Sequence, residues 1–332
     1  MPESSPLIWD AHSCVPLHPA VDLSILHKHR LSGAHFVSIN VGMDFNPVGQ
    51  IMMVLGSFRA QVLADPLLCL VDQSIDIVAA KREGMLGVAF DLEGSVPLLD
   101  QPSMVELYWS LGVRQIHLAY NRNNSIAGGC HDTEQGLTKL GHTMVTEVNR
   151  VGMLLDVSHN SYQTSMDIFA ASSKPVIYSH ANPKALIDHR RNIRDEQIKA
   201  CAATGGVICT NGVERFLGSL SVDAFLDHLC YTAELVGAEH VGIGIDTCAT
   251  QQGINDDPAD FDPLYWWPPE DYPRGFSQLS YLQPEHIPEI ANGLVKRGFS
   301  SSEQTAILGG NMMRVASQCW DQHDSNQSVV FD

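Results

Sequence analysis

Eight short apolar runs alternate along the chain with segments of helical periodicity, and this alternation limits the folds open to it. The runs span 7–12, 34–40, 87–94, 113–121, 153–159, 175–180, 206–212 and 240–246. Several are almost continuously apolar and rich in β-branched residues, which is typical of strands buried on both faces of a parallel sheet. Helices are predicted between them, for example over 161–171, 195–204 and 221–236. The pattern predicts an α/β fold, a (β/α)8 TIM barrel.

The chain has 332 residues, which a barrel of this kind accommodates as one domain, so we expect a single domain over 1–332. A long stretch at about 247–283, rich in proline, acidic and aromatic residues, follows the last predicted strand. We expect it to lie over the barrel mouth as a lid or wall, or at a subunit interface, with an insertion that has no functional role as the alternative. A helical C-terminal segment is predicted over 284–320, with helices at 284–297 and 301–308.

Polar side chains stand at or next to the ends of seven of the eight runs. They are His12, Asn40, Glu93, Asn121, His159, His180 and Asp246. Active sites of (β/α)8 barrels lie at the C-terminal ends of the strands, so we expect these groups to converge there. A doubly wound sheet is the alternative fold, but its single crevice would not explain polar endings on nearly every strand.

The charge of the chain argues against polyanionic partners. Asp and Glu number 38 against 20 Lys and Arg, a formal net charge of −18. Such a surface repels nucleic-acid phosphates and anionic membranes, so the expected partner is a small molecule.

The sequence lacks a secretory signal pattern and a run of about 18 apolar residues, so we expect a cytoplasmic protein that does not enter membranes. The eight cysteines contain no C-x-x-C pair and are expected to be mostly reduced.

The strongest chemical signal is the pair His159 and His180, which close two successive strands, together with Glu93 at the end of another. Two imidazoles and a carboxylate suit a divalent metal such as Zn²⁺ and leave room for water. His12 is a fourth candidate, and Cys14, two residues on, would share its face of the strand. Taken singly, each residue could have a purely structural role, as a hydrogen-bonded histidine or a small buried cysteine. Only their combination favours a metal site.

Two further residues are candidates for the reaction itself. Asp246 would enter the same mouth and suits a general acid and base, although a helix cap or a structural ion pair is the alternative. Arg191 lies on the loop after His180 and suits the binding of a substrate carboxylate, with solvated surface charge as the alternative.

The remaining histidines are expected to be surface or hydrogen-bonded core residues: His18, His27, His29, His35, His117, His131, His142, His189, His228, His240, His286 and His323.

Taken together, these residues resemble the renal, or membrane, dipeptidase family of metallopeptidases. The resemblance is carried by WDAHS, FDLEG, LGVRQIHLAYNRNN, GLTKLGHTMVTEVNRVGMLLDVSH, KPVIYSHANPKAL, HRRNI, VGIGID and LGGNMMRV, and most specifically by the stretch from Gly136 to His180. It implies a barrel of the amidohydrolase type, two zinc ions bridged by a glutamate, and hydrolysis of dipeptides, often by homodimers. The roles that it implies are a bridging carboxylate for Glu93, zinc ligands for His159, His180 and His12, a proton shuttle for Asp246 and a carboxylate-binding role for Arg191.

The chain departs from this family at two positions. Cys14 stands where the family has an aspartate ligand, and Tyr120 stands where it has a histidine that is expected to polarise the scissile carbonyl. A thiolate also binds zinc, so either two metals bind or a single metal is held by Glu93, His159 and His180. Tyr120 retains a hydroxyl that donates a hydrogen bond to an oxyanion, and it is therefore predicted to contact substrate and to assist catalysis.

The sequence therefore predicts a metal-dependent hydrolase that cleaves dipeptides or similar small amides with a metal-activated hydroxide. Two alternatives stay open. One keeps the metal and changes the substrate to a non-peptide amide or lactam. The other is a non-catalytic relative that binds a ligand through the same mouth.

Overall fold

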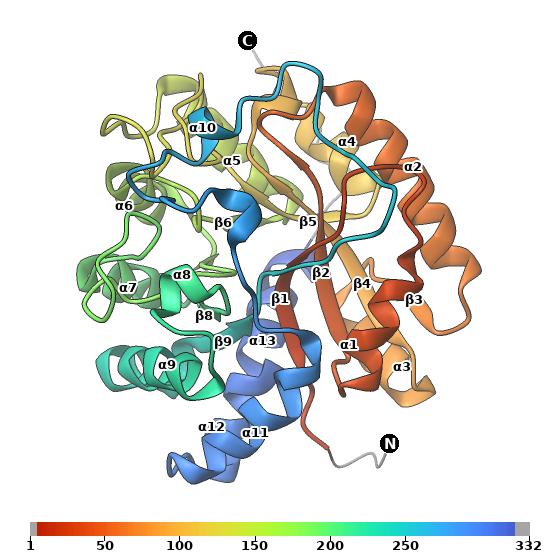
Figure 1. Ribbon diagram of the computed structural model, residues 1–332, viewed down its shortest axis with the longest axis vertical. Helices are drawn as coiled ribbons and strands as arrows, with labels where there is room; N and C mark the ends of the chain where they lie inside the picture. Colours follow the sequence, from red (N-terminus) through yellow and green to blue (C-terminus); the bar gives the residue numbers. More distant parts are fainter. Residues whose placement is uncertain (1–4, 323–332) are drawn as a thin grey trace.

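A ring of parallel strands forms the centre of the computed structural model, which describes residues 5–322 (Figure 1). Each of the eight predicted runs overlaps one strand of the ring. They are β1 (Trp9–Cys14), β2 (Phe36–Met43), β4 (Leu86–Glu93), β5 (Val113–His117), β6 (Leu154–Asp156), β7 (Val176–Ile177), β8 (Ile208–Asn211) and β9 (Val241–Gly244). Strands β1, β2, β4, β5, β6 and β7 pair in that order, and β8 pairs with β9, all in parallel.

Backbone hydrogen bonds on both sides of the β8–β9 pair close the ring. Just past β7, the Tyr178 N–H donates to the Val207 carbonyl at 2.9 Å, and the Cys209 N–H donates to the Tyr178 carbonyl at 2.7 Å. On the other side, the Asp246 N–H donates to the His12 carbonyl at 3.0 Å. The (β/α)8 prediction is confirmed, and the open sheet of the doubly wound alternative is excluded.

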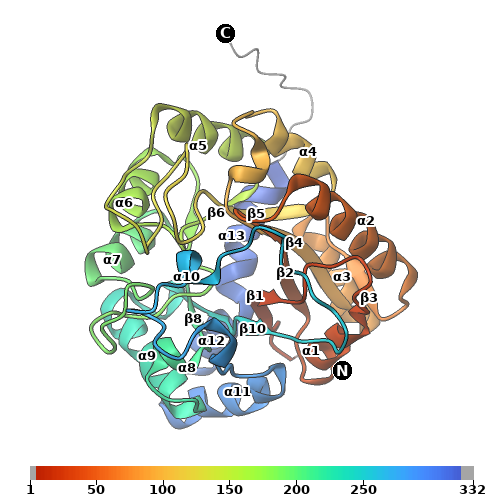
Figure 2. The same cartoon turned by 45° about the horizontal axis from the view of Figure 1, so that its top comes forward.

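Helices surround the ring, as Figure 2 shows with the C-terminal ends of the strands turned forward. The longer ones are α2 (Val48–Ala64), α3 (Ser74–Glu83), α4 (Met104–Ser110), α5 (Lys139–Val151), α6 (Tyr162–Ala171), α7 (Asp195–Ala203), α9 (Val222–Val236), α11 (Ile287–Lys296) and α13 (Asn311–Cys319). The predicted helices over 161–171 and 221–236 begin where serine caps them, because Ser161 Oγ accepts from the Thr164 N–H at 3.0 Å and Ser221 Oγ accepts from the Ala224 N–H at 3.2 Å. Of the helices in residues 5–322, none has the length and apolar character needed to cross a bilayer.

The strand ends differ from the prediction. Strands β5, β6 and β7 stop before Asn121, His159 and His180, so these residues lie in the segments that lead from the sheet into the mouth. The structure has two short strands that the sequence does not predict: β3 (Leu68–Leu70), which pairs with the first residues of β4, and β10 (Thr247–Cys248), which pairs with β1. Each has three residues or fewer, too few to show a period in the sequence.

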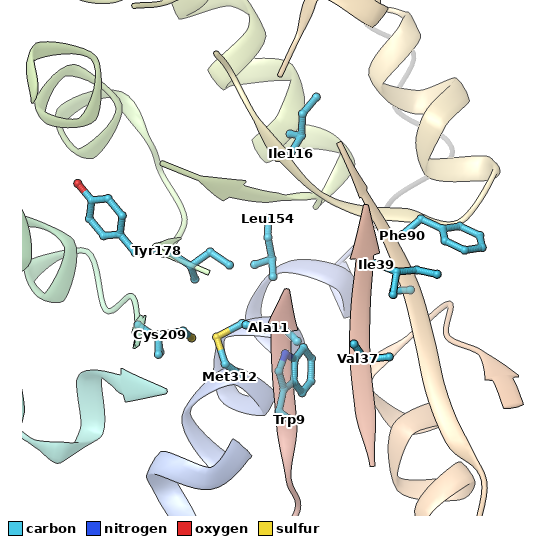
Figure 3. Packing of buried hydrophobic residues seen from close by; sticks show 14 of the residues in the cluster. Trp9, Ala11, Val37, Ile39, Phe90, Ile116, Leu154, Tyr178, Cys209 and Met312 are labelled. Atoms are coloured by element: carbon cyan, nitrogen blue, oxygen red, sulfur yellow. The ribbon is translucent and has the colours of Figure 1, made fainter. Parts of the chain in front are cut away.

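Apolar side chains fill the ring, and α13 closes its N-terminal end (Figure 3). Met312 of α13 lies near Ala11 and Cys209 inside the ring in Figure 3. The Trp320 indole, just after α13, lies 5.5 Å from the Trp9 ring between centroids and donates from Nε1 to the Arg114 carbonyl at 3.1 Å. The C-terminal helix is therefore part of the core.

The segment 247–283 crosses the opposite end of the ring. It contains the short helix α10 (Pro263–Trp266), which Figure 2 shows above the strand ends. Asn121 Nδ2 donates to the Trp266 carbonyl at 3.1 Å and ties this segment to the chain that follows β5. Because the segment lies where the strands point, its side chains border the mouth.

We predict that replacing Trp320 with alanine lowers the free energy of unfolding by about 3–5 kcal/mol, because the side chain is 2 % exposed and packs on Trp9. Urea denaturation followed by circular dichroism measures this change. Val295→Ala is the control, because Val295 is 59 % exposed on α11 and its loss is expected to change stability by less than about 0.5 kcal/mol. Equal stability of the two variants would show that α13 does not stabilise the barrel.

Candidate metal centre

Three histidine side chains from different parts of the ring converge on the carboxylate of Glu93. Glu93 is the last residue of β4, His12 lies in β1, and His159 and His180 follow β6 and β7. The Nε2 atoms of His159, His12 and His180 lie 2.9, 3.4 and 3.5 Å from Glu93 Oε1. All four side chains are buried. The fold thus brings together four of the five predicted metal ligands, and the fifth, Cys14, lies beside His12.

Oxygen atoms orient the rings of His159 and His12 from behind. His159 Nδ1 lies 2.8 Å from Asn121 Oδ1, and because an amide oxygen only accepts, Nδ1 carries the proton. His12 Nδ1 lies 3.2 Å from Asp91 Oδ1. Both contacts favour the tautomer whose Nε2 is free of a proton and faces Glu93, the form in which imidazole binds a metal.

The approach of His159 and His180 indicates that a cation fits between them. Their Nε2 atoms lie 2.9 Å apart, and His180 Nδ1 lies 2.7 Å from Ser179 Oγ, which suits the same tautomer. Two Nε2 lone pairs that face each other at this distance repel, and a divalent metal removes that repulsion by accepting both. The residues present therefore fit the metal that the sequence predicts.

Cys14 places a sulfur beside the same carboxylate. It follows His12 by two residues in β1, so both side chains share one face, and Cys14 Sγ lies 3.4 Å from His12 Nε2. The donor atoms of His12, Cys14 and Glu93 lie within 4.8 Å of one another, as do those of Glu93, His159 and His180. Because the two groups share Glu93, the centre has donors for two neighbouring cations.

Burial and neighbouring charge set the protonation of the donors. Burial raises the pKa of Glu93 to about 7, because an isolated carboxylate is costly inside the barrel. Burial alone would lower the pKa of His12, but the carboxylates of Asp91 and Glu93 outweigh it and raise that pKa well above its usual value. Positive charge is therefore favoured between His12 and Glu93, where a cation would lie.

The other two imidazoles are held neutral. Burial lowers the pKa of His159 well below its usual value, and the Arg191 guanidinium lowers it further. Burial also lowers the pKa of His180 well below its usual value, and the nearby positive charge of His12 lowers it further. Neutral imidazole is the ligand form, so these two donors need not lose a proton when a metal binds near neutral pH.

Asp246 reaches the centre from the turn that follows β9. Its backbone is left-handed, with φ 56°, and its Oδ2 accepts from Asn211 Nδ2 at 2.8 Å while Oδ1 lies 3.8 Å from His12 Nε2. Gly244, two residues earlier, lets β9 approach the chain that follows β7, because a Cβ at this position would lie 1.7 Å from the Ser179 carbonyl oxygen. Burial raises the pKa of Asp246, a shift that suits proton transfer.

Arg191 borders the centre beside His159. It is 3 % exposed, and its Nη2 lies 3.3 Å from His159 Nε2. The guanidinium donates to the Ser158 and His180 carbonyls, and it pairs with no carboxylate in residues 5–322. A buried guanidinium without an acidic partner is available for an anionic group of a ligand.

Tyr120 covers the other flank of His159, with their ring centroids 4.3 Å apart. The phenol is buried, and burial raises its pKa well above the usual value. Its hydroxyl therefore keeps its proton and remains a hydrogen-bond donor at the centre. The sequence-predicted residues Tyr120, Arg191 and Asp246 all line one cavity with Cys14 and Glu93.

This cavity has a volume of about 50 Å³. Away from Glu93 and His159 its walls are mostly apolar and aromatic, and six of the lining residues come from the segment 247–283. These six are Cys248, Trp267, Tyr272, Phe276, Leu279 and Tyr281, and Met43, Val213 and Phe216 add apolar side chains from elsewhere in the chain. The segment thus forms a wall of the cavity, whose charged lining residues are Arg191, Glu93 and Asp246.

Several supporting residues were not identified from the sequence. His117, predicted to be a surface or hydrogen-bonded core residue, is such a core residue: it is buried as the last residue of β5, and its Nε2 lies 2.8 Å from Asp156 Oδ2. Asp156 Oδ1 accepts from the Ser158 N–H at 3.1 Å and the Ser179 N–H at 3.2 Å, and so holds both segments that carry the ligands after β6 and β7. A polar residue ending a strand is the signal that would have marked His117.

His131 has the same prediction, a surface or hydrogen-bonded core residue, and it is a buried residue next to the wall of the cavity. Its Nε2 lies 2.9 Å from Tyr272 Oη, and its Nδ1 lies 3.1 Å from Asp271 Oδ2. His131 therefore anchors the segment 247–283 and does not face the metal ligands.

Comparison with known proteins supports the resemblance seen in the sequence. A family model described as membrane dipeptidase, peptidase family M19, matches residues 18–264, a span that begins after His12 and Cys14. An uncharacterized dipeptidase of Schizosaccharomyces pombe is 31% identical over 259 residues, which is 74% of this chain and 56% of that protein. The chain spans about half the length of the curated relatives it matches.

Solved structures share the fold. An amidohydrolase from Pseudomonas aeruginosa superimposes with a TM-score of 0.83 and 24% identity, covering 96% of this chain and 98% of its own. A metallopeptidase from Rhodobacter sphaeroides, liganded with a phosphinate mimic of the dipeptide L-Ala-D-Ala, gives a TM-score of 0.76 with 18% identity over 95% of this chain and 100% of its own. These similarities support the barrel architecture.

We predict that Asp91→Asn weakens metal binding by about 10- to 100-fold, because it removes the charge that orients and polarises His12. Equilibrium dialysis of the metal-free protein against Zn²⁺ measures the affinity. Asp223→Asn is the matched control, since the Asp223 side chain is 90% exposed on α9. Unchanged affinity in a folded Asp91→Asn protein would show that His12 does not bind the metal.

Proposed function

Because the chain belongs to the membrane dipeptidase family, we propose that it is a metal-dependent hydrolase that cleaves the amide bond of dipeptides or similar small amides. The observation that carries this proposal is the set of three imidazoles around Glu93, with their Nε2 atoms 2.9 to 3.5 Å from one carboxylate oxygen. Such a centre has no evident structural purpose in a barrel whose core is already filled by apolar side chains.

We propose zinc as the metal, in one or two ions. Imidazole nitrogen, carboxylate oxygen and thiol sulfur are the ligand types that zinc accepts, and sulfur disfavours magnesium or calcium. Glu93, His159 and His180 would hold one ion, and His12, Cys14 and Glu93 the other. When bound, the metal supplies a polarised carbonyl and an acidified water.

The residues of the chain account for the proton transfers. Asp246 would take a proton from the attacking water and return it to the leaving nitrogen, a role that its raised pKa and its place 3.8 Å from His12 favour. Tyr120 would donate its hydroxyl proton in a hydrogen bond to the oxygen that gains charge as the carbonyl is attacked.

Arg191 would bind the carboxylate of a dipeptide through its guanidinium. The apolar and aromatic wall formed by the segment 247–283 would exclude water and take up uncharged substrate side chains, so we propose dipeptides with small apolar residues as substrates. The homodimer and the cytoplasmic location remain predictions from the sequence, as does the absence of nucleic-acid partners.

The first prediction of this proposal concerns the metal. Chelation should abolish hydrolysis of Ala- and Leu-containing dipeptides, Zn²⁺ should restore it, and His159→Ala should lower kcat/KM by at least about 1,000-fold, because the ligand is lost. Amine release followed by liquid chromatography measures turnover. His142→Ala is the control, since His142 is exposed on α5. Full turnover by chelated protein or by His159→Ala would refute the proposal.

The second prediction separates substrate binding from structural damage. Arg191→Ala should reduce the preference for a dipeptide over the same dipeptide with a C-terminal amide by about 10- to 100-fold, because only the free carboxylate pairs with the guanidinium. The ratio of the two kcat/KM values is unaffected by a general loss of active protein. Arg190→Ala is the matched control, because Arg190 pairs with Glu270 and Asp271. An unchanged ratio in Arg191→Ala would exclude Arg191 from carboxylate binding.

A further inference from the structure

Two cysteines are direct neighbours across strands at the edge of the metal centre. Cys14 of β1 and Cys248 of β10 are partners in the parallel register of these strands. Adjacent strands lie about 4.7–4.9 Å apart, which is within the range of about 4.4–6.8 Å between Cα atoms that a disulfide spans. Register partners of a parallel pair also place their side chains on the same face of the sheet.

The two thiols share their surroundings as well as their register. Both line the cavity that contains Glu93, Tyr120 and Asp246, and all cysteines in residues 5–322 are free thiols. The Ala249 N–H donates to the Cys14 carbonyl at 2.9 Å, which holds β10 against β1. Since β10 is two residues long and leads into irregular chain, Cys248 can shift toward Cys14 without displacing a long strand.

A second cavity gives a reagent access to the pair. It has a volume of about 220 Å³, and Cys14 and Cys248 line it together with His29, Thr250 and other residues. Lys28 also lines it, and the Lys28 side chain is 54% exposed, so the cavity reaches the surface. The two cysteines therefore border both cavities, and the second cavity is a route to them other than the substrate cavity.

We propose that Cys14 and Cys248 form an intrachain disulfide when the protein meets a low-molecular-weight disulfide such as oxidised glutathione. One cysteine thiolate attacks the reagent and releases one thiol, and the second cysteine then attacks the mixed disulfide and releases the other. The balance is two protein thiols and one reagent disulfide converted into one protein disulfide and two reagent thiols. The protein is oxidised by two electrons and the reagent is reduced.

The disulfide would change the metal centre, and this consequence rests on the proposed role of Cys14 as a metal ligand. Cys14 Sγ lies 3.4 Å from His12 Nε2, in the donor group that would hold the second ion. A disulfide sulfur carries no negative charge, and the thiolate is the form that binds a metal. Oxidation would therefore empty this position and leave Glu93, His159 and His180 in place.

The test treats the metal-free full chain with oxidised glutathione and maps the disulfides by mass spectrometry after alkylation and non-reducing digestion. The expected result is one peptide pair that joins Cys14 to Cys248, lost in Cys14→Ser and in Cys248→Ser. Cys69→Ser is the control, because Cys69 is half-buried in β3, away from Cys14 and Cys248 in the sheet order, and should leave the pair intact. Wild-type protein in which both Cys14 and Cys248 remain alkylatable would overturn the proposal, and this result depends on no variant.

A measurement of zinc content tests the effect of the disulfide on metal binding separately from the formation of the disulfide. Reduced and oxidised wild-type protein are dialysed against Zn²⁺ and analysed for metal, and the oxidised form should hold one ion fewer, with the difference removed by a thiol reductant. A disulfide that leaves the zinc content unchanged would show that Cys14 is not a ligand. Absence of zinc from both forms would contradict the proposed function, while the mapped disulfide would still stand.

Discussion

The structure depends on a carboxylate that the fold buries where water cannot solvate it. Glu93 ends the central strand β4, is 2 % exposed, and has a pKa raised to about 7 by burial. A buried carboxylate needs compensating positive charge, and three imidazoles supply Nε2 atoms directed at its Oε1. Two of these imidazoles are themselves kept neutral by burial. A bound cation satisfies the carboxylate and the imidazoles together, and this requirement explains why so many polar groups converge inside an otherwise apolar barrel.

The barrel meets this requirement because parallel strands all deliver their C-terminal ends to one mouth. Residues distant in sequence, such as His12 and His180, become neighbours with ring centroids 4.2 Å apart. The connecting residues stabilise the positions. Asp156, whose pKa is lowered to about 2 by His117 and by hydrogen bonds that outweigh its burial, fixes the segments before both His159 and His180. The chain after β9 then crosses the mouth and gives the site its apolar wall.

Much of this arrangement follows from the sequence, because its physical causes are local. The eight strands are predictable because each is a buried apolar run, and the ligand residues because they follow those runs. The strand ends are not predictable to the residue, since β7 ends at Ile177 although Tyr178 still pairs with Ile208 and the Ala181 N–H still donates to the Cys209 carbonyl. The oxygen atoms behind the imidazoles, from Asp91 and Asn121, depend on side-chain rotamers and on contacts between strands that no periodicity records. The same holds for the wall, whose aromatic residues gain their positions only through long-range contacts such as that between His131 and Tyr272.

Cys14 stands where the family has an aspartate, so the set of donor atoms in this centre differs from the family's pattern. A sulfur beside His12 would favour zinc over harder cations and, in the proposed two-ion centre, would make the second metal position sensitive to oxidation. The most direct test of the account is a crystal structure of the protein grown with Zn²⁺, with anomalous diffraction measured on both sides of the zinc absorption edge. The account predicts an anomalous peak bound by Glu93, His159 and His180, and a second one bound by Glu93, His12 and Cys14. A crystal with zinc in the solvent and no peak at Glu93 would contradict it.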